Sequence, residues 1–224
     1  MTTSVAHERI ENLDRGPLDR RELAAVIARD IPAGSYVNLG IGQPTLVADH
    51  LSAEAGIVLQ TENGMLGMGP AASGADVDAD LINAGKVAVT ETPGASYFHH
   101  ADSFAMMRGG HIDVCVLGAF QVSRHGDLAN WHTGAPDDIP AVGGAMDLAI
   151  GAKTVVVMMN LFGRDGAAKL VPECTYPLTG LRCVRRVYTD YATFDVYPES
   201  GVRVRETFGI RMAELASRMT IELR

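Results

Sequence analysis

A single glutamate follows a short apolar segment, at the kind of place where α/β proteins bind ligands. Ile57-Val58-Leu59 is predicted to be a buried strand, and Glu62 comes three residues after it. Gly64, Gly67 and Gly69 follow, so the backbone here can adopt dihedral angles that other residues rarely take. A partly desolvated carboxylate at the carboxyl end of a strand can act as a covalent nucleophile. Asn-Gly is also a common turn dipeptide, so spacing alone leaves open a solvated turn residue.

Two glycine pairs offer backbone N–H groups to an anion. Gly40 and Gly42 follow a predicted strand. Gly143 and Gly144, just before Ala145, are a second place where the backbone could approach a ligand. The first pair resembles part of a dinucleotide fingerprint, but residue 45 is Thr where the third glycine would stand. We therefore expect an anion or oxyanion site rather than a nicotinamide cofactor.

The adjacent histidines His99 and His100, with Asp102 close by, resemble a metal site only superficially. None of the usual spacings of histidine ligands accompanies them, so we predict no metal. They are better candidates for a pocket that binds an anionic substrate, with loop-surface histidines as the alternative. No serine lies in a G-x-S-x-G context, which argues against a serine hydrolase.

The elements that must position Glu62 begin with a capped helix. Asp19 and Glu22 have the spacing of a capping box, which predicts a helix that ends near Pro32. A strand over 36–39, a glycine loop, a helix that begins near Pro44 and the strand before Glu62 then follow. This order predicts a pair of parallel strands joined by a right-handed crossover.

The rest of the chain favours one α/β domain over residues 19–224, preceded by a polar arm over residues 1–18. We expect a single open, mainly parallel sheet with flanking helices. Residues 64–86 and 124–147 are expected to be loops. The remaining expected elements are strands over 87–90, 113–117, 154–159, 181–189, 193–197 and 202–204, a helix over 101–108, and a terminal amphipathic helix marked by Phe208, Met212, Leu215 and Met219.

Composition narrows the function classes. Apolar residues make up 47% of the 224 residues, and charged residues 21%, which is typical of a globular domain. The net charge of −8 argues against nucleic-acid binding. No apolar run approaches the roughly 18 residues of a membrane helix, and the N-terminus has no secretory pattern. Three cysteines without a C-x-x-C pair favour reduced thiols in the cytoplasm.

Taken together, several segments resemble the B subunit of the two-subunit family I CoA-transferases, from about residue 20 to the C-terminus. The resemblance implies a fold of the CoA-transferase or NagB/RpiA-like type. The matching segments are 37–45, 62–70, 80–86, 101–111, 126–131, 143–147 and 177–180. The family usually has Ser before the glutamate, where this chain has Thr61, and both residues offer a hydroxyl group.

The resemblance implies that Glu62 is the catalytic nucleophile and carries CoA as a glutamyl-CoA thioester. Coenzyme A would then be a substrate, with no permanently bound cofactor. Asn63, Gln121 and Asn130 become candidate polar contacts to the substrate or to CoA, beside the glycine pairs at 40 and 42 and at 143–144. Three cations, Arg108, Arg124 and Lys169, are candidates for binding the anionic substrates, with Arg108 grouped with the two histidines.

The resemblance further implies transfer of CoA from succinyl-CoA to a 3-oxo acid. Segments 98–102, 130–134 and 171–176 favour 3-oxoadipate, an intermediate of aromatic degradation in the β-ketoadipate pathway, over acetoacetate. It also implies a partner, the A subunit of such an enzyme, in a heterodimer or an α2β2 assembly. A sugar-phosphate isomerase and a non-catalytic ligand-binding subunit remain the competing interpretations.

Overall fold

The computed structural model describes residues 10–14, 16–135, 137, 139–140 and 143–224. Its larger sheet has ten strands, and a smaller one has three. In spatial order the larger sheet contains β1 (Ile10–Asn12), β13 (Gly201–Phe208), β12 (Ala192–Tyr197), β11 (Val184–Tyr188), β9 (Thr154–Met158), β6 (Val114–Leu117), β2 (Tyr36–Leu39), β3 (Val58–Thr61), β4 (Met65–Ala71) and β5 (Val89–Tyr97). The smaller sheet contains β10 (Leu170–Val171), β7 (Gln121–Ser123) and β8 (Leu128–Ala129).

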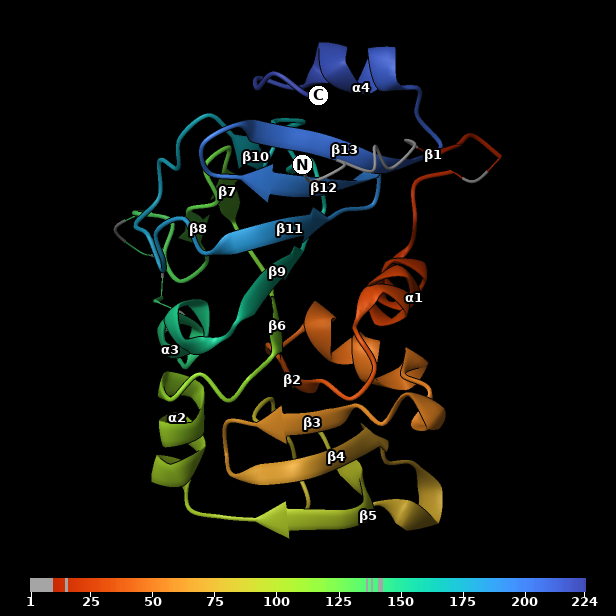
Figure 1. The fold of residues 1–224 in the computed structure, drawn as a ribbon, viewed down its shortest axis with the longest axis vertical. Coiled ribbons are helices and arrows are strands. Elements are labelled where there is room, and N and C mark those ends of the chain that lie inside the picture. The colour runs from red at the N-terminus through yellow and green to blue at the C-terminus, as the bar shows by residue number, and fades with distance from the viewer. Residues whose placement is uncertain (1–9, 15, 136, 138, 141–142) are drawn as a thin grey trace, which may run out of the picture.

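The helices cover both faces of the larger sheet (Figure 1). They are α1 (Arg20–Asp30), α2 (His100–Arg108), α3 (Ala145–Gly151) and α4 (Met212–Arg218), with short 3-10 helices η1 (Gln43–His50), η2 (Ala53–Ala55) and η3 (Gly74–Asp76). Figure 1 shows α1 on one side of the stacked strands, and α2 and α3 on the other. Among the described helices, none is long and apolar enough to cross a membrane.

The centre of the sheet is parallel, as the sequence predicts. Strands β11, β9, β6, β2 and β3 run parallel to one another, and antiparallel strands flank them on both sides. This confirms the expected open, mainly parallel α/β sheet with flanking helices. Parallel strands of this kind are buried on both faces, which explains why the central segments are almost continuous apolar runs.

Alternation along β6 divides the core into two clusters. Val114 and Val116 pack in the cluster that includes α1, whereas Cys115 and Leu117 pack in the cluster that includes Leu148 of α3. Successive side chains of a strand point to opposite faces, so one strand contributes to both layers. The sheet is therefore held on both sides, which fixes its carboxyl edge.

The predicted capping box at the start of α1 is confirmed. The Asp19 carboxylate accepts hydrogen bonds from the backbone N–H groups of Arg21 and Glu22, both at 2.8 Å. The Glu22 carboxylate accepts the Asp19 N–H at 2.9 Å. Leu18 and Leu23 are both buried in the cluster beside α1, as a hydrophobic staple requires.

The expected loop over 64–86 is wrong, because it contains β4. Glycines make the segment look irregular, but here they permit the close approach of β5. A Cβ added at Gly67 would lie 2.9 Å from Thr92 Oγ1 and 3.0 Å from the Ala95 Cα. The short strand expected at 87–90 is in fact the start of β5, which runs to Tyr97 and pairs with β4 through two register shifts.

Other expected boundaries also differ. The segment over 124–147 contains β8 and the start of α3. The helix after Pro44 is a 3-10 helix, and Phe208 ends β13 rather than beginning α4. Residues 10–12, within the expected polar arm, form β1 parallel to β13, and residues 1–9 lie outside the described part of the chain.

Candidate functional site

A cavity of about 570 Å³ lies at the carboxyl ends of four neighbouring strands, β9, β6, β2 and β3. This is the edge where open α/β sheets bind ligands. Its lining comes mainly from the segments that directly follow these strands, with additional residues from α3 and from the segment before β10. The lining residues are Gly40, Ile41, Gln43, Pro44, Glu62, Leu117, Gly118, Ala119, Phe120, Asn130, Gly143, Gly144, Ala145, Met158, Met159, Asn160 and Lys169.

Glu62 is the first residue after β3, and its side chain is partly buried in the cavity wall. The turn that follows is the one expected from Asn-Gly, closed by the Gly64 N–H on the Thr61 carbonyl at 3.1 Å. Gly64 has φ +112°, and an added Cβ would collide with the Phe98 carbonyl oxygen. Asn63 points away from the cavity and donates from Nδ2 to the Ile82 carbonyl at 2.8 Å.

Burial raises the pKa of the Glu62 carboxyl group above its usual value, because desolvation disfavours the charged form. The backbone N–H of Gly144 and the nearby His100 act in the opposite direction, and Asp147 adds to the increase. Gly144 lies directly against the carboxylate: a Cβ there would be 2.7 Å from the Glu62 Cδ and Oε2 atoms. A desolvated carboxylate beside a backbone donor suits nucleophilic catalysis with a nearby oxyanion contact.

A buried chain of polar side chains fixes the strand end that carries Glu62. Asn38 Nδ2 donates to Gln60 Oε1 at 2.6 Å, across the register pair between β2 and β3. Gln60 Nε2 donates to Ser103 Oγ at 2.6 Å, and Ser103 Oγ donates to the Thr61 carbonyl at 3.0 Å. The chain therefore ties α2 to the backbone adjacent to Glu62.

Sequence reasoning missed this chain, although a signal was present. Asn38 and Gln60 are polar residues inside apolar strand segments, and both are almost fully buried. Buried polar groups need partners, so their positions could have indicated a cross-strand pair. Nothing local in the sequence indicated Ser103 as the third member, since it comes from a helix that follows in the chain about 40 residues later.

The glycines of the two predicted pairs differ in how they contribute to the cavity. Gly40 lines the cavity, and its N–H bonds to the Val116 carbonyl at 2.8 Å. Gly42 has φ +92° and forms the N-cap of η1, so its role here is in the turn. Gly143 is an exposed lining residue, and Gly144 is the buried one that contacts Glu62.

The two remaining amides expected to contact the substrate or CoA, Asn130 and Gln121, make hydrogen bonds within the protein, as Asn63 does. Asn130 lines the cavity, but its Nδ2 donates to the Gly118 carbonyl at 3.1 Å and its Oδ1 accepts from Thr179 Oγ1 at 2.6 Å. Gln121 lies outside the cavity lining, and its Oε1 accepts the Thr175 N–H at 2.8 Å. Asn130 therefore shapes the wall, whereas Gln121 holds a neighbouring loop.

The histidines and Arg108 lie around α2 rather than in the cavity lining. His99 is the N-cap of α2, and its Nδ1 accepts the Ala101 N–H at 3.1 Å. His100 is exposed and is close enough to Glu62 to favour its charged form. Arg108 makes a 2.6 Å ion pair with Asp147. Of this predicted group, only His100 acts electrostatically on the carboxylate directly.

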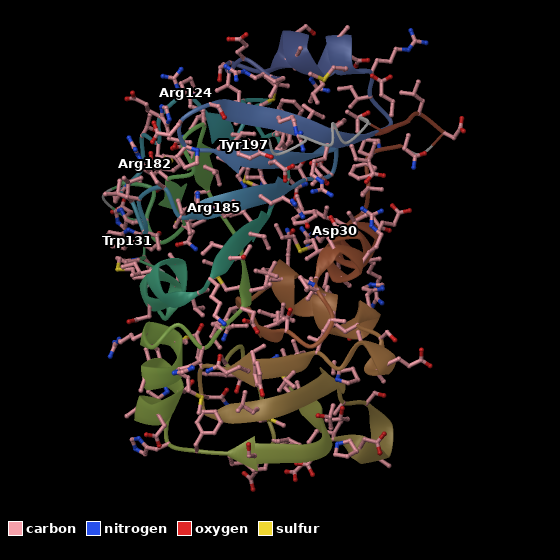
Figure 2. All side chains as sticks on the ribbon, in the orientation of Figure 1. Asp30, Arg124, Trp131, Arg182, Arg185 and Tyr197 are labelled. Atoms are coloured by element: carbon pink, nitrogen blue, oxygen red, sulfur yellow. The ribbon has the colours of Figure 1, made fainter. Side chains whose placement is uncertain are left out.

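Lys169 supplies positive charge to the cavity, and Arg124 does not. Arg124 lies on the outside of the molecule near the small sheet (Figure 2). Lys169 is partly buried, and burial lowers the pKa of its ammonium group, while the charge of Asp190 opposes the decrease. Among the described residues, no group of histidine, cysteine and carboxylate side chains could hold a metal ion.

Comparison with known proteins identifies the family to which this chain is similar. Residues 20–207 match the profile described as Coenzyme A transferase. The B subunit of a 3-oxoadipate CoA-transferase from Pseudomonas putida is 61% identical over 84% of this chain and 88% of its own length. The corresponding protein from Acinetobacter baylyi is 54% identical over 88% and 91%.

Solved structures agree on the fold. An acyl-CoA transferase of Escherichia coli O157:H7 has a TM-score of 0.70 at 19% identity, over 95% of this chain and 43% of that one. Glutaconate coenzyme A-transferase of Acidaminococcus fermentans has a TM-score of 0.68 at 15% identity, over 94% and 87%. The family match spans most of the chain and its relatives are well above 30% identical, so this protein belongs to the coenzyme A transferase family.

Proposed function

We propose that this chain is the B subunit of a cytoplasmic CoA-transferase that moves CoA from succinyl-CoA to 3-oxoadipate through a thioester on Glu62. The observation that carries the proposal is the Glu62 carboxylate itself, partly desolvated in a cavity at the strand ends and contacted by the Gly144 N–H. The substrates come from the names of the P. putida and A. baylyi relatives and of a Helicobacter pylori succinyl-CoA:3-ketoacid relative at 52% identity.

In the first half of the reaction, a Glu62 carboxylate oxygen attacks the thioester carbonyl of succinyl-CoA. The C–S bond breaks and CoA leaves as a thiolate, which gives a mixed anhydride of Glu62 and succinate. The thiolate then attacks the Glu62 carbonyl carbon, and succinate leaves with the electrons of the broken C–O bond. The Gly144 N–H, already bound to the carboxylate, is placed to stabilise the negative oxygen that forms on Glu62.

In the second half, the carboxylate of the 3-oxo acid attacks the glutamyl thioester and expels the CoA thiolate. The thiolate attacks the acceptor's acyl carbon, and the Glu62 carboxylate is regenerated. The reaction requires a carboxylate because only an acid group can take the place of both substrates in turn. The mainly apolar cavity wall limits water near the thioester, which protects it from hydrolysis.

A second polypeptide is part of the proposal. The relatives that match nearly end to end are named as B subunits. A human mitochondrial relative matches 80% of this chain but only 35% of its own length. We therefore propose that an A subunit, encoded as a separate chain, completes the enzyme as a heterodimer or an α2β2 assembly. Three free cysteines are consistent with a reducing compartment.

The test is to mix the chain with succinyl-CoA in the presence of its A subunit, reduce with borohydride, and map the modified peptide by mass spectrometry. Modification of Glu62, and its loss in Glu62→Gln, is the expected result. Full transfer activity in Glu62→Gln would refute the covalent mechanism and favour a non-catalytic role for this chain. Faster turnover with acetoacetate than with 3-oxoadipate would reverse the proposed acceptor.

A further inference from the structure

The cavity contains two ionisable side chains of opposite charge. Among the described residues that line it, Glu62 and Lys169 are the ionisable ones. Lys169 takes part in none of the ion pairs found among the described residues. Its charge is therefore available to a ligand, although the chain as a whole carries a net charge of −8.

The fold attaches these two groups to the outermost of the four neighbouring strands whose ends form the cavity. Glu62 follows β3, whereas the Lys169 backbone N–H bonds to the Leu161 carbonyl, just beyond the end of β9, at 2.8 Å. Strands β3, β2, β6 and β9 are consecutive in the sheet. With about 4.8 Å between neighbouring strands, the two attachment points lie roughly 14 Å apart.

This span suits a short dicarboxylic acid. A lysine side chain extends roughly 6 Å and a glutamate roughly 4 Å, so the charged groups lie between about 4 and 14 Å apart, depending on their direction. A chain of four to six carbons has roughly 4 to 6.5 Å between its terminal carboxyl carbons, since each C–C bond of about 1.5 Å advances an extended chain by roughly 1.3 Å. With contacts of about 3 Å at each end, such an acid fits between the two groups.

We propose that Lys169 binds the free carboxylate of a dicarboxylic acyl substrate while the reacting carboxyl group lies at Glu62. This inference rests on the proposed function and names the residue that recognises the second carboxylate. Asp190 supports the arrangement, because its carboxylate is held by the Leu161 N–H at 2.8 Å and favours the charged form of Lys169. An ammonium group would also suit a phosphate of CoA, and the experiment must separate the two.

The experiment uses the complete two-subunit complex and compares Lys169→Met with the wild type. In a double-displacement reaction, kcat/KM for an acid depends only on its own half-reaction with the glutamyl-CoA enzyme. Exchange of labelled succinate into succinyl-CoA gives kcat/KM for a dicarboxylate, and transfer of CoA to acetoacetate gives kcat/KM for a monocarboxylate. We expect kcat/KM for succinate and for 3-oxoadipate to fall about 10- to 100-fold, the loss typical of a charge-assisted hydrogen bond.

For acetoacetate, which has no second carboxylate, the expected change is less than about threefold. Lys169→Arg keeps the charge and should recover most of the dicarboxylate activity. The matched control is Lys153→Met, since Lys153 is exposed, pairs with Asp113 at 2.8 Å and precedes β9 at the opposite edge of the sheet.

Equal losses for succinate and acetoacetate would overturn the inference and indicate a CoA phosphate or a structural role. Unchanged activity with all acids would overturn it as well. Failure of the proposed function gives a different result, because the wild-type complex would then show neither succinate exchange nor modification of Glu62.

Discussion

Gly144 offers a direct way to displace the Glu62 carboxylate without disturbing the fold. Its φ is −69° and its ψ −1°, a conformation that alanine adopts without strain. A Cβ at this position would lie 2.7 Å from Cδ and from Oε2 of Glu62, and 3.1 Å from Oε1. The three atoms nearest to that Cβ all belong to the Glu62 carboxylate, so Gly144→Ala acts first on this group.

The size of the displacement follows from these distances. Ordinary van der Waals contact begins near 3.4 Å, so the carboxylate must retreat by 3.4 − 2.7 = 0.7 Å or rotate away. A shift of about 1 Å in a reacting group can reduce the rate on the order of 100-fold, so we expect kcat to fall about 10- to 100-fold. Stability should be unchanged or increase by about 0.4–1 kcal/mol, because alanine lowers the entropy of the unfolded chain.

The assay measures kcat with succinyl-CoA, the yield of the Glu62 adduct, and the free energy of unfolding in urea. Gly16→Ala is the matched control, since a Cβ there meets no atom within 4 Å. Wild-type kcat and adduct yield in Gly144→Ala would show that contact with this glycine does not set the position of Glu62. A large loss of stability would show instead that the variant disturbs the fold.

Four other predictions follow from the described contacts. Ser103→Ala removes a buried hydroxyl group that has two hydrogen-bond partners, so it should lower the free energy of unfolding in urea by about 1–3 kcal/mol. Thr193→Val is the matched control, because it removes a buried hydroxyl group that has no partner among the described residues. Its free energy of unfolding in urea should be unchanged or higher. Because burial raises the Glu62 pKa above 4.5, kcat/KM for succinyl-CoA should fall on acidification at a pH above that value, and an acid limb at or below pH 4.5 would contradict the structure. The same raised pKa gives a stability contribution that is fully present below pH 4.5 and is lost as pH rises through the folded-state pKa, so Glu62→Gln should gain stability relative to wild type at pH 7 and not at pH 4. Burial raises the thiol pKa to about 12 for Cys174 and about 11 for Cys183. Mass spectrometry of native protein at pH 8 should therefore show alkylation about 100-fold slower than for a free thiol at Cys183, and slower still at Cys174. Rapid labelling would show that the thiols are open to solvent.

The parallel centre of the sheet could be predicted because its signals are local. The capping box at Asp19 and the apolar strand at 36–39 are each encoded within a few residues. The strand before Glu62 could be placed in the same way, and its parallel pairing with the strand at 36–39 follows from the helix between them. Glu62 could therefore be placed at the carboxyl edge from the sequence.

Strand β4 escaped prediction although the Asn-Gly turn before it is a local signal of a hairpin with β3. Its glycines hide the strand pattern, and its other edge pairs with β5 about 25 residues away. The same limit applies to the candidate amides. Gln121 was expected to contact the substrate or CoA, whereas its partner in the fold is Thr175, 54 positions further on. Which partner a polar side chain finds is decided by tertiary structure.

A carboxylate nucleophile must be ionised and also poorly solvated, and these demands conflict. Burial favours the neutral acid, and the Gly144 N–H and His100 offset this effect at Glu62. Asp147 works against ionisation, yet its own charge is paired with Arg108 at 2.6 Å, outside the cavity lining. Arg108 neutralises part of the Asp147 charge, which reduces the repulsion between Asp147 and Glu62. The ionisation of Glu62 thus depends on charges in α2 and α3 that the sequence around Glu62 does not contain.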